Sequence, residues 1–446
     1  ILMVLKYPEE YLVGEKVLGF GIDRRVSPLQ KDEEKRIRNL SDKERALRFN
    51  GFVITDEQGN IVFEDRKRYA QHFFPLSVID YVGAMYNFER HKKPIPILSV
   101  DSHDVLQCDF RCQDCLSAHG TNFPIKQFPK DNFKMDLEAY KRMLKEIADY
   151  SEKRGFRGVR FEQSGEGNPD YYRHRQEILR YAKELGMQSV YVSTGSKIDE
   201  NLRKALVENS SFIRISFPGI GEAYKPYSGQ SEFTFTDALN GLGKIIDERD
   251  KQGRKKDLMI GARVALRAEH SDTYFNFANR LKDLGIDSLQ IVKILVPEGR
   301  TPYDFPLSSK YVCDLEETAT LDDSHFNVSV PHGLDSMVYS REIENRAEFP
   351  TQCFSARFQP VLAGRSLFAC TISDIMYSHN LRLGTFANED GELERFLSEE
   401  NLGRVTKGIP SQCKSCSNIY DNMLLFSLQN LFRENNQKLN FYEIIK

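Results

Sequence analysis

Three cysteines lie within eight residues of this chain, Cys108, Cys112 and Cys115, in the spacing C-x3-C-x2-C. Thiolates hold iron–sulfur clusters, and a complete [4Fe–4S] cluster takes four of them. Three neighbouring thiolates therefore leave one iron without a protein ligand, and an open position on a metal is where a substrate can bind. Zinc sites usually pair cysteines as C-x2-C and add a second pair or histidines. The motif predicts a cluster with one free coordination position, with a zinc loop or chance clustering as the alternative.

A glycine-rich segment follows one strand and helix later, Ser164-Gly165-Glu166-Gly167-Asn168-Pro169. Glycines let the backbone approach a ligand closely, and Pro169 fixes the direction in which the chain leaves. The segment directly follows a predicted strand, which is a typical place for a ligand-binding loop. By itself such a loop is equally typical of an ordinary strand–helix turn.

Together the two segments resemble the radical S-adenosylmethionine (radical SAM) superfamily, whose signature is C-x3-C-x2-C followed by a GGEP-type motif. The chain departs from the usual pattern at Asp114, where most members have an aromatic residue, and at Ser164, where many have a second glycine. The resemblance implies that Cys108, Cys112 and Cys115 bind a [4Fe–4S] cluster. Its open iron would chelate the amino and carboxylate groups of S-adenosylmethionine (SAM) and cleave SAM reductively to a 5′-deoxyadenosyl radical.

The resemblance also implies contacts to SAM at the ends of later strands. The segment 193–195 resembles the family's T-N-G stretch, and 214–217 resembles its R-x-S segment. Many relatives bind the SAM carboxylate with an arginine after the fourth strand, and this chain has none there. The residues expected to contact SAM are Gly165, Glu166, Gly167, Ser193, Arg214 and Ser216.

Four further cysteines lie near the end of the chain, Cys353, Cys370, Cys413 and Cys416. Four thiolates can saturate one cluster and leave no iron open. Their layout resembles the single-cluster "twitch" form of the SPASM-type extension, with Gly364 at the place of its hairpin glycine. The full SPASM motif is absent, so the resemblance implies one auxiliary [4Fe–4S] cluster. Structural zinc held by the same four residues is the alternative.

Cys313 remains outside both cysteine sets. A thiol gives up a hydrogen atom readily because its S–H bond is weaker than a typical C–H bond. The position is similar to that of the lone cysteine that quenches the substrate radical in several radical SAM epimerases. Cys313 is therefore a candidate hydrogen-atom donor, and the alternative is a small buried hydrophobic residue.

The composition excludes several other classes of protein. The 446 residues carry a formal net charge of −3 with a pI near 6.4, which gives no polyanion-binding signature. No apolar stretch approaches the roughly 18 residues of a spanning helix, and the start of the sequence lacks the features of a signal peptide. Clustered cysteines suit metal ligation in a reducing compartment better than a disulfide framework. We expect a cytoplasmic protein without nucleic-acid or membrane partners.

Apolar periodicity predicts an α/β fold. Strand-like and helix-like stretches alternate from residue 95 to 297, the pattern of a parallel sheet faced by helices. The resemblance implies a partial (β/α)6 TIM-like barrel over residues 93–300, although periodicity alone also allows a flat doubly wound sheet. Residues 1–92 form a separate α+β region in this reading, with hairpins over 14–22 and 51–63. Residues 301–446 form the auxiliary-cluster domain.

These features favour a radical SAM oxidoreductase or epimerase, supplied with electrons by a reductant such as flavodoxin or ferredoxin. The polar, tyrosine-rich sequence favours epimerisation or dehydrogenation of a sugar or aminocyclitol in natural-product biosynthesis. A maturase that epimerises or cross-links a ribosomal peptide is the second hypothesis. Residues 1–92 resemble, without diagnostic residues, the winged-helix peptide-recognition segment of some such maturases, and a cap over the barrel mouth is the alternative. A zinc–cysteine binding module is the non-enzyme alternative.

Overall fold

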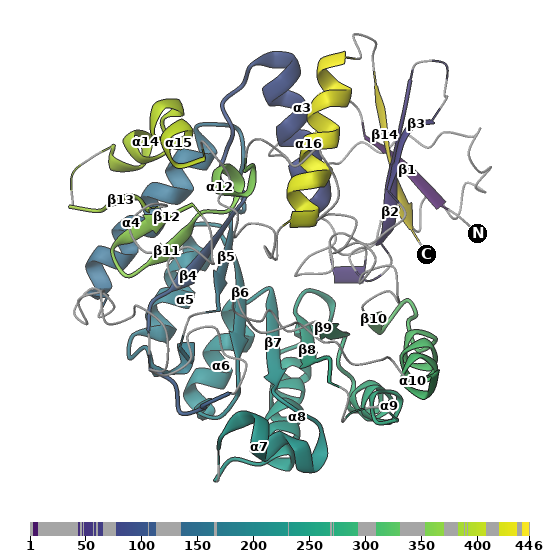
Figure 1. Ribbon diagram of the computed structural model, residues 1–446. Coiled ribbons are helices and arrows are strands. Elements are labelled where there is room, and N and C mark those ends of the chain that lie inside the picture. Colours follow the sequence, from purple (N-terminus) through teal and green to yellow (C-terminus); the bar gives the residue numbers. More distant parts are fainter. Residues whose placement is uncertain are drawn as a thin grey trace.

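The computed structural model describes residues 3–7, 43–44, 47, 49–56, 58, 61–65, 77–105, 107–112, 135–164, 167–230, 232–267, 270, 272–292, 309–330, 353–369, 382–387, 389, 391–406, 419–434 and 439–445. Two sheets organise these residues (Figure 1). The larger sheet has ten strands in the order β10-β9-β8-β7-β6-β5-β4-β11-β12-β13, and the smaller has four. No helix in the described part of the chain is long and apolar enough to cross a membrane.

Six parallel strands form the centre of the larger sheet, and each is followed by a helix. The strands are β4 (Ser99–His103), β5 (Arg160–Gln163), β6 (Gln188–Ser193), β7 (Phe212–Phe217), β8 (Met259–Ala265) and β9 (Ser288–Val292). The helices are α4 (Leu137–Glu152), α5 (Arg175–Glu184), α6 (Glu200–Asn209), α8 (Phe235–Lys251), α9 (Tyr274–Leu284) and α10 (Ser309–Ala319). The predicted βα alternation is therefore confirmed, with boundaries that differ from the prediction by a few residues.

Local sequence signals explain why these helices form where they do. The side chain of Asp136 accepts hydrogen bonds from the backbone N–H groups of Glu138 and Ala139, both at 3.0 Å, and caps α4. Along α4, Tyr140, Met143, Leu144 and Ile147 recur at helical spacing and are all buried. Thr234 and Asp237 form a capping box at the start of α8. Short 3₁₀ turns occur at Pro169–Tyr171, Gly221–Ala223 and Arg254–Lys256.

The two faces of the parallel strands differ in character. On β7, Ile213, Ile215 and Phe217 belong to the core cluster that contains Leu239 and Leu242 of α8, so they face the helices. The alternate residues Phe212, Arg214 and Ser216 face the other way. We call this second face the inner face. It carries several buried charged side chains, which a packed apolar core would exclude.

Strands outside the predicted barrel extend the sheet at both edges. β10 (Asn327–Ser329) adds in parallel to β9, and β11 (Val361–Ala363) adds in parallel to β4. β11, β12 (Ser366–Phe368) and β13 (Arg382–Thr385) then continue antiparallel. The short helices α12 (Ser355–Phe358), α14 (Glu392–Phe396) and α15 (Glu399–Thr406) lie beside this edge (Figure 1).

The smaller sheet joins the two ends of the chain. Its order is β1 (Met3–Tyr7), β14 (Asn440–Ile445), β2 (Phe49–Thr55) and β3 (Ile61–Asp65), all antiparallel. Beside it, α3 (Ser77–His91) packs against α16 (Ile419–Glu434) (Figure 1). The hairpin predicted at 51–63 is confirmed as β2–β3, whereas the one at 14–22 lies outside the described residues. Nothing in the sequence predicted that β14 would pair between β1 and β2.

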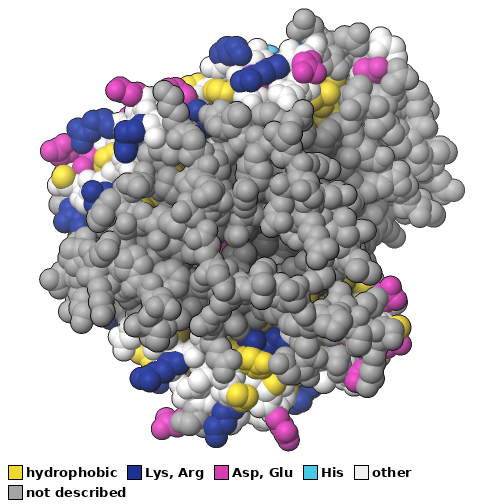
Figure 2. Space-filling model, in the orientation of Figure 1, with side chains coloured by type: hydrophobic (Ala, Val, Ile, Leu, Met, Phe, Trp, Pro, Cys, Tyr) yellow, Lys and Arg dark blue, Asp and Glu magenta, His cyan; other side chains and the backbone are white. Residues whose placement is uncertain are grey.

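The described surface carries charges of both signs. Figure 2 shows acidic and basic side chains interspersed over the described part of one face. This pattern agrees with the net charge of −3.

Candidate active site

The loops at the C-terminal ends of β4, β5 and β6 bring the predicted motifs together. Cys108 and Cys112 follow β4, and both are half-buried against the core cluster on the helix side of the sheet. Gly167 and Asn168 follow β5, and residues 194–196 follow β6. Of the predicted site residues here, Cys115, Gly165 and Glu166 lie outside the described residues. Ligand sites of parallel α/β folds lie at this end of the strands, so the placement suits a binding site.

The cysteine loop is hydrogen-bonded to the glycine-rich loop through backbone groups. The N–H of Gly167 donates to the carbonyl of Val105 at 3.1 Å, and the N–H of Asn168 donates to the carbonyl of Gln107 at 2.8 Å. The two motifs are therefore parts of one structure, although 48 residues lie between Cys115 and Ser164 in the sequence.

A segment after β7 holds the cysteine loop from the other side. The N–H of Arg111 donates to the carbonyl of Ser228 at 2.8 Å, and the Gln230 side-chain amide donates to the carbonyl of Asp109 at 3.2 Å. Gly229 lies between these contacts with a φ of +60°. A Cβ atom there would lie 2.8 Å from the Arg111 carbonyl oxygen. Sequence reasoning missed this contact, because nothing in residues 228–230 indicates what they touch.

The surroundings of Cys108 suit a thiolate ligand. The backbone N–H of Phe110 donates to the Cys108 sulfur at 3.4 Å, an interaction that stabilises negative charge on sulfur. The Phe110 ring is 1% exposed and meets Tyr224 and Phe233 at centroid distances of 6.2 and 6.0 Å. The described part of the loop thus fits an iron–sulfur cluster in its donors and its apolar shell. No group of three metal-binding side chains occurs among the described residues, and Cys115 is not one of them.

Asn168 links the glycine-rich loop to the turn after β6. Its amide nitrogen donates to the hydroxyls of Thr194 and Ser196 at 3.1 and 3.3 Å. The predicted SAM contact Ser193 donates instead to the carboxylate of Asp170, at 2.8 and 2.7 Å to its two oxygens. It also accepts the N–H of Gly195 at 2.8 Å. The Ser193 hydroxyl is therefore engaged within the protein and shapes the 194–196 turn.

A buried arginine ties the bases of these loops together. Arg175 is 2% exposed and binds both carboxylate oxygens of Asp104 at 2.8 Å. It also donates to the Gln163 side chain at 2.6 Å and to the Pro169 carbonyl at 2.8 and 3.0 Å. Asp104 begins the loop to Cys108, Gln163 ends β5, and Pro169 ends the glycine-rich segment. One bidentate side chain thus sets the relative position of both loops.

The inner face below these loops is lined with buried charges. Burial and the neighbouring carboxylate of Asp101 raise the pKa of Glu162 to about 8, against the opposing effect of Arg214. Burial and the nearby Arg263 guanidinium lower the pKa of Arg214. Arg214 donates to the Gln290 side chain at 3.0 Å. The predicted residue Arg214 is thus part of a charged lining of the barrel interior.

Two neighbouring groups complete this lining. The predicted residue Ser216 is partly exposed on the same face and is paired in register with Arg263. On β4, the carboxylate of Asp101 accepts the Ser164 hydroxyl at 2.6 Å and lies 3.1 Å from Nε2 of His103. The inner face is therefore a polar surface that can orient a polar ligand.

Of the remaining predicted cysteines, Cys353 and Cys313 are among the described residues. Cys353 is half-buried and packs against the core that contains α12 residues. The hairpin β11–β12 turns at Gly364, whose φ is +57°, in the interval between Cys353 and Cys370. Cys370, Cys413 and Cys416 lie outside the described residues. Cys313 is exposed on α10, which packs against α9.

Comparison with known proteins places this architecture. No family model matches the chain. Over 170 residues the chain is 26% identical to the Fe-coproporphyrin III synthase of Methanosarcina barkeri (strain Fusaro / DSM 804), and this match covers 38% of the chain and 38% of that relative. The chain therefore matches well under half of that relative's length.

The fold is shared with SuiB of Streptococcus suis. The TM-score is 0.54 at 12% identity, covering 81% of this chain and 79% of SuiB. The complex of SuiB with S-adenosylmethionine gives a TM-score of 0.53 at 11% identity over 77% of this chain and 76% of SuiB. The complex with the precursor peptide SuiA gives 0.52 at 11% identity over 77% and 74%. The chain shares the fold of SuiB, so the predicted partial barrel is confirmed at the level of the fold.

Proposed function

We propose that this chain is a radical SAM enzyme in which Cys108, Cys112 and Cys115 hold a [4Fe–4S] cluster that binds SAM. The observation that carries the proposal is the loop after β4, where Cys108 and Cys112 lie half-buried and backbone hydrogen bonds join the loop to Gly167 and Asn168. The C-x3-C-x2-C spacing supplies three thiolates and leaves one iron open. A protein fold shared with a SAM-binding enzyme supports the same assignment.

When bound, the cluster supplies the electron that cleaves SAM to methionine and a 5′-deoxyadenosyl radical. The protein must bind SAM, orient it and exclude water. We assign the backbone of 165–167 to the methionyl amino group, and Ser216 and Arg214 to the ribose and carboxylate. Ser193 contributes by holding the 194–196 turn through Asp170. Apolar packing around Phe110 keeps water from the cysteine loop.

We assign Cys353, Cys370, Cys413 and Cys416 to one auxiliary [4Fe–4S] cluster. The hairpin with Gly364 at its turn supports this assignment, because it lies between the first two of these cysteines. An auxiliary cluster can accept an electron from a substrate radical, which favours dehydrogenation or cross-linking. The exposure of Cys313 on α10 weakens its candidacy as a hydrogen-atom donor within the barrel.

A peptide is the substrate class that we propose first. SuiB shares this fold over about three quarters of the chain and is seen with the precursor peptide SuiA. The sugar or aminocyclitol hypothesis stays second, supported by the sequence composition and by the polar inner face around Glu162 and Arg214. Electrons would come from flavodoxin or ferredoxin.

Anaerobic reconstitution tests the proposal. Wild-type protein should bind about eight irons per chain, as expected for two cubanes, and show broad absorbance near 400 nm. With SAM and a reductant it should release 5′-deoxyadenosine and methionine. A Cys108→Ala/Cys112→Ala/Cys115→Ala variant should keep about half of the iron and release neither product. Colourless, zinc-loaded wild-type protein would instead support the non-enzyme module.

Substrate class is tested with the same reconstituted protein. Peptides encoded beside this gene, and a panel of aminocyclitols, would be incubated in deuterated solvent and analysed by mass spectrometry. Loss of two hydrogens from a peptide supports oxidation or cross-linking, whereas uptake of one solvent deuterium supports epimerisation. In the second case Cys313→Ala should still form 5′-deoxyadenosine and lose the product. Unchanged turnover of that variant would remove Cys313 from the mechanism.

A further inference from the structure

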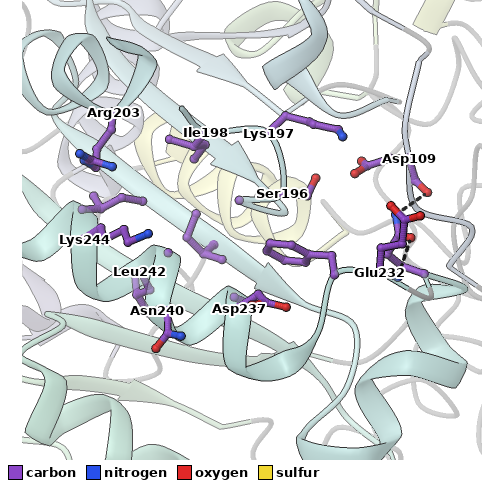
Figure 3. Close-up of a pocket in the computed structure, with 17 residues that line it drawn as sticks. Asp109, Ser196, Lys197, Ile198, Arg203, Glu232, Asp237, Asn240, Leu242 and Lys244 are labelled. Carbon is purple, nitrogen blue, oxygen red and sulfur yellow. Dashed lines mark hydrogen bonds between the residues drawn. The ribbon is translucent and has the colours of Figure 1, made fainter. Parts of the chain in front are cut away.

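A cavity outside the barrel interior lies between α6, α8 and the cysteine loop (Figure 3). Its volume of about 470 Å³ falls in the range of small-molecule sites. Its walls come from the turn after β6, the helix-facing side of β7 and the first turns of α8. This cavity is separate from the inner face that carries Glu162 and Arg214, because Ile215 of β7 lines it from the opposite side of the sheet.

One end of the cavity is basic. Figure 3 shows Arg203 of α6 and Lys244 of α8 at the same end. Neither side chain makes an ion pair with any residue in the described part of the chain, and the same holds for Lys197 on the rim. The Nε of Arg203 is buried and has no hydrogen-bond partner among the described residues. Each of these cations is available to an anionic ligand.

The opposite end offers hydrogen-bond acceptors. Asp109 and Glu232 lie there, across the cavity from Arg203 (Figure 3). One carboxylate oxygen of Asp109 is buried and also lacks a partner among the described residues. Buried polar groups are rarely left unsatisfied, because each costs the free energy of its lost hydration. The unpaired donor of Arg203 at one end and the unpaired acceptor of Asp109 at the other point to a ligand that carries an acceptor and a donor at its two ends.

We propose that this cavity binds a small organic oxyanion that also carries an amino or hydroxyl group. The oxyanion contacts Arg203 and Lys244, since guanidinium and ammonium groups form charge-assisted hydrogen bonds with phosphate and carboxylate oxygens. The amino or hydroxyl group donates to Asp109. The carbon skeleton lies over the apolar side chains of Ile198 and Phe233. The site is additional to the proposed SAM chemistry and does not depend on it.

Calorimetry on the anaerobic, cluster-loaded protein tests the site with four probes. Glucosamine 6-phosphate carries both groups and should bind most tightly. Glucose 6-phosphate should bind more weakly, because its hydroxyl is a poorer partner for a carboxylate than an ammonium. Glucosamine, which has no oxyanion, should not bind. Glucuronate carries a carboxylate where glucose 6-phosphate carries a phosphate. The tighter binder of these two probes identifies the oxyanion that the site prefers.

Variants locate the binding. Arg203→Gln and Lys244→Gln should each weaken glucosamine 6-phosphate binding by about tenfold or more, the effect of losing one charged hydrogen bond. Lys204→Gln is the matched control, because Lys204 lies on α6 beside Arg203, pairs with Glu200 at 2.5 Å and does not line the cavity. It should bind as the wild type does. No heat from any oxyanion at millimolar concentration, or equal affinity in Arg203→Gln, Lys244→Gln and wild type, would overturn the proposal. Circular dichroism checks that each variant is folded.

Discussion

Single residues of the inner face show how the barrel interior departs from an ordinary core. Asp101, Glu162 and Arg214 are 5%, 4% and 2% exposed, yet all three carry ionisable groups. Burying a charge is costly unless opposite charges and hydrogen bonds compensate. Here Asp101 and Glu162 lie on the neighbouring strands β4 and β5, and Arg214 lies on β7 of the same face. Such groups are retained where a polar ligand must be oriented, which agrees with a substrate or SAM site.

The pKa of Glu162 gives a prediction about pH. Its value of about 8 in the folded protein lies above the ordinary value of 4.5, because burial and Asp101 disfavour the charged form. The folded state therefore holds a proton that the unfolded state releases, and the contribution of Glu162 to stability falls as pH rises from about 4.5 to about 8. Glu162→Gln removes this fall in stability with rising pH, because a glutamine side chain does not ionise. Thermal unfolding between pH 5.5 and 9 should show a Tm difference, variant minus wild type, that grows with pH. A constant difference would contradict the assigned pKa.

Among the secondary-structure elements, the cysteine loop depends on segments from two other βα units. Its backbone is bonded to the loop after β5 and to the turn after α7 (Tyr224–Ser228). A loop held on both sides keeps its thiolates in place before any metal arrives, so less conformational entropy is lost on binding.

Gly229 tests the contact after α7. Gly229→Ala should lower iron occupancy after reconstitution, because the new Cβ would lie 2.8 Å from the Arg111 carbonyl and displace the loop. Gly253→Ala is the matched control, since Gly253 has a similar φ of +69° and nothing within 4 Å of the Cβ position. Both variants should lose about 1–2 kcal/mol from the left-handed backbone, and only Gly229→Ala should also lose iron. Equal iron content in the two variants would show that the contact is not needed.

At the level of the whole molecule, Lys43 and Leu47 of the N-terminal region pack against the N-terminal ends of the barrel strands. Leu47 is 3% exposed and packs with Val190, Phe212 and Met259 near the N-terminal ends of β6, β7 and β8. Nearby, the ammonium of Lys43 lies 2.6 Å from the carboxylate of Asp287, just before β9. Lys43 and Leu47 are therefore part of the barrel's packing.

Leu47→Ala tests this role of the N-terminal region. Removing a buried leucine should lower the free energy of unfolding by about 2–5 kcal/mol through lost burial and a residual cavity. The change should appear in urea unfolding followed by circular dichroism, which reports on the helices around the sheet. If Leu47 did not pack against the barrel strands, its replacement by alanine would leave the urea midpoint almost unchanged. An unchanged midpoint would therefore refute this packing.

Local pattern in the sequence was sufficient for the alternating strands and helices of the barrel. Apolar residues at every second position define strand β7, and α4 begins directly after the capping residue Asp136. The cysteine spacing and the glycine-rich segment are equally local, since each lies within a few residues of chain. Only the tertiary structure decided that Ser228 and Gln230 hold the cysteine loop, that Arg175 joins Asp104 to Pro169, and that β14 completes the first sheet. These contacts pair groups far apart in the chain through ordinary hydrogen bonds, and no periodicity or spacing in one segment encodes the identity of such a distant partner.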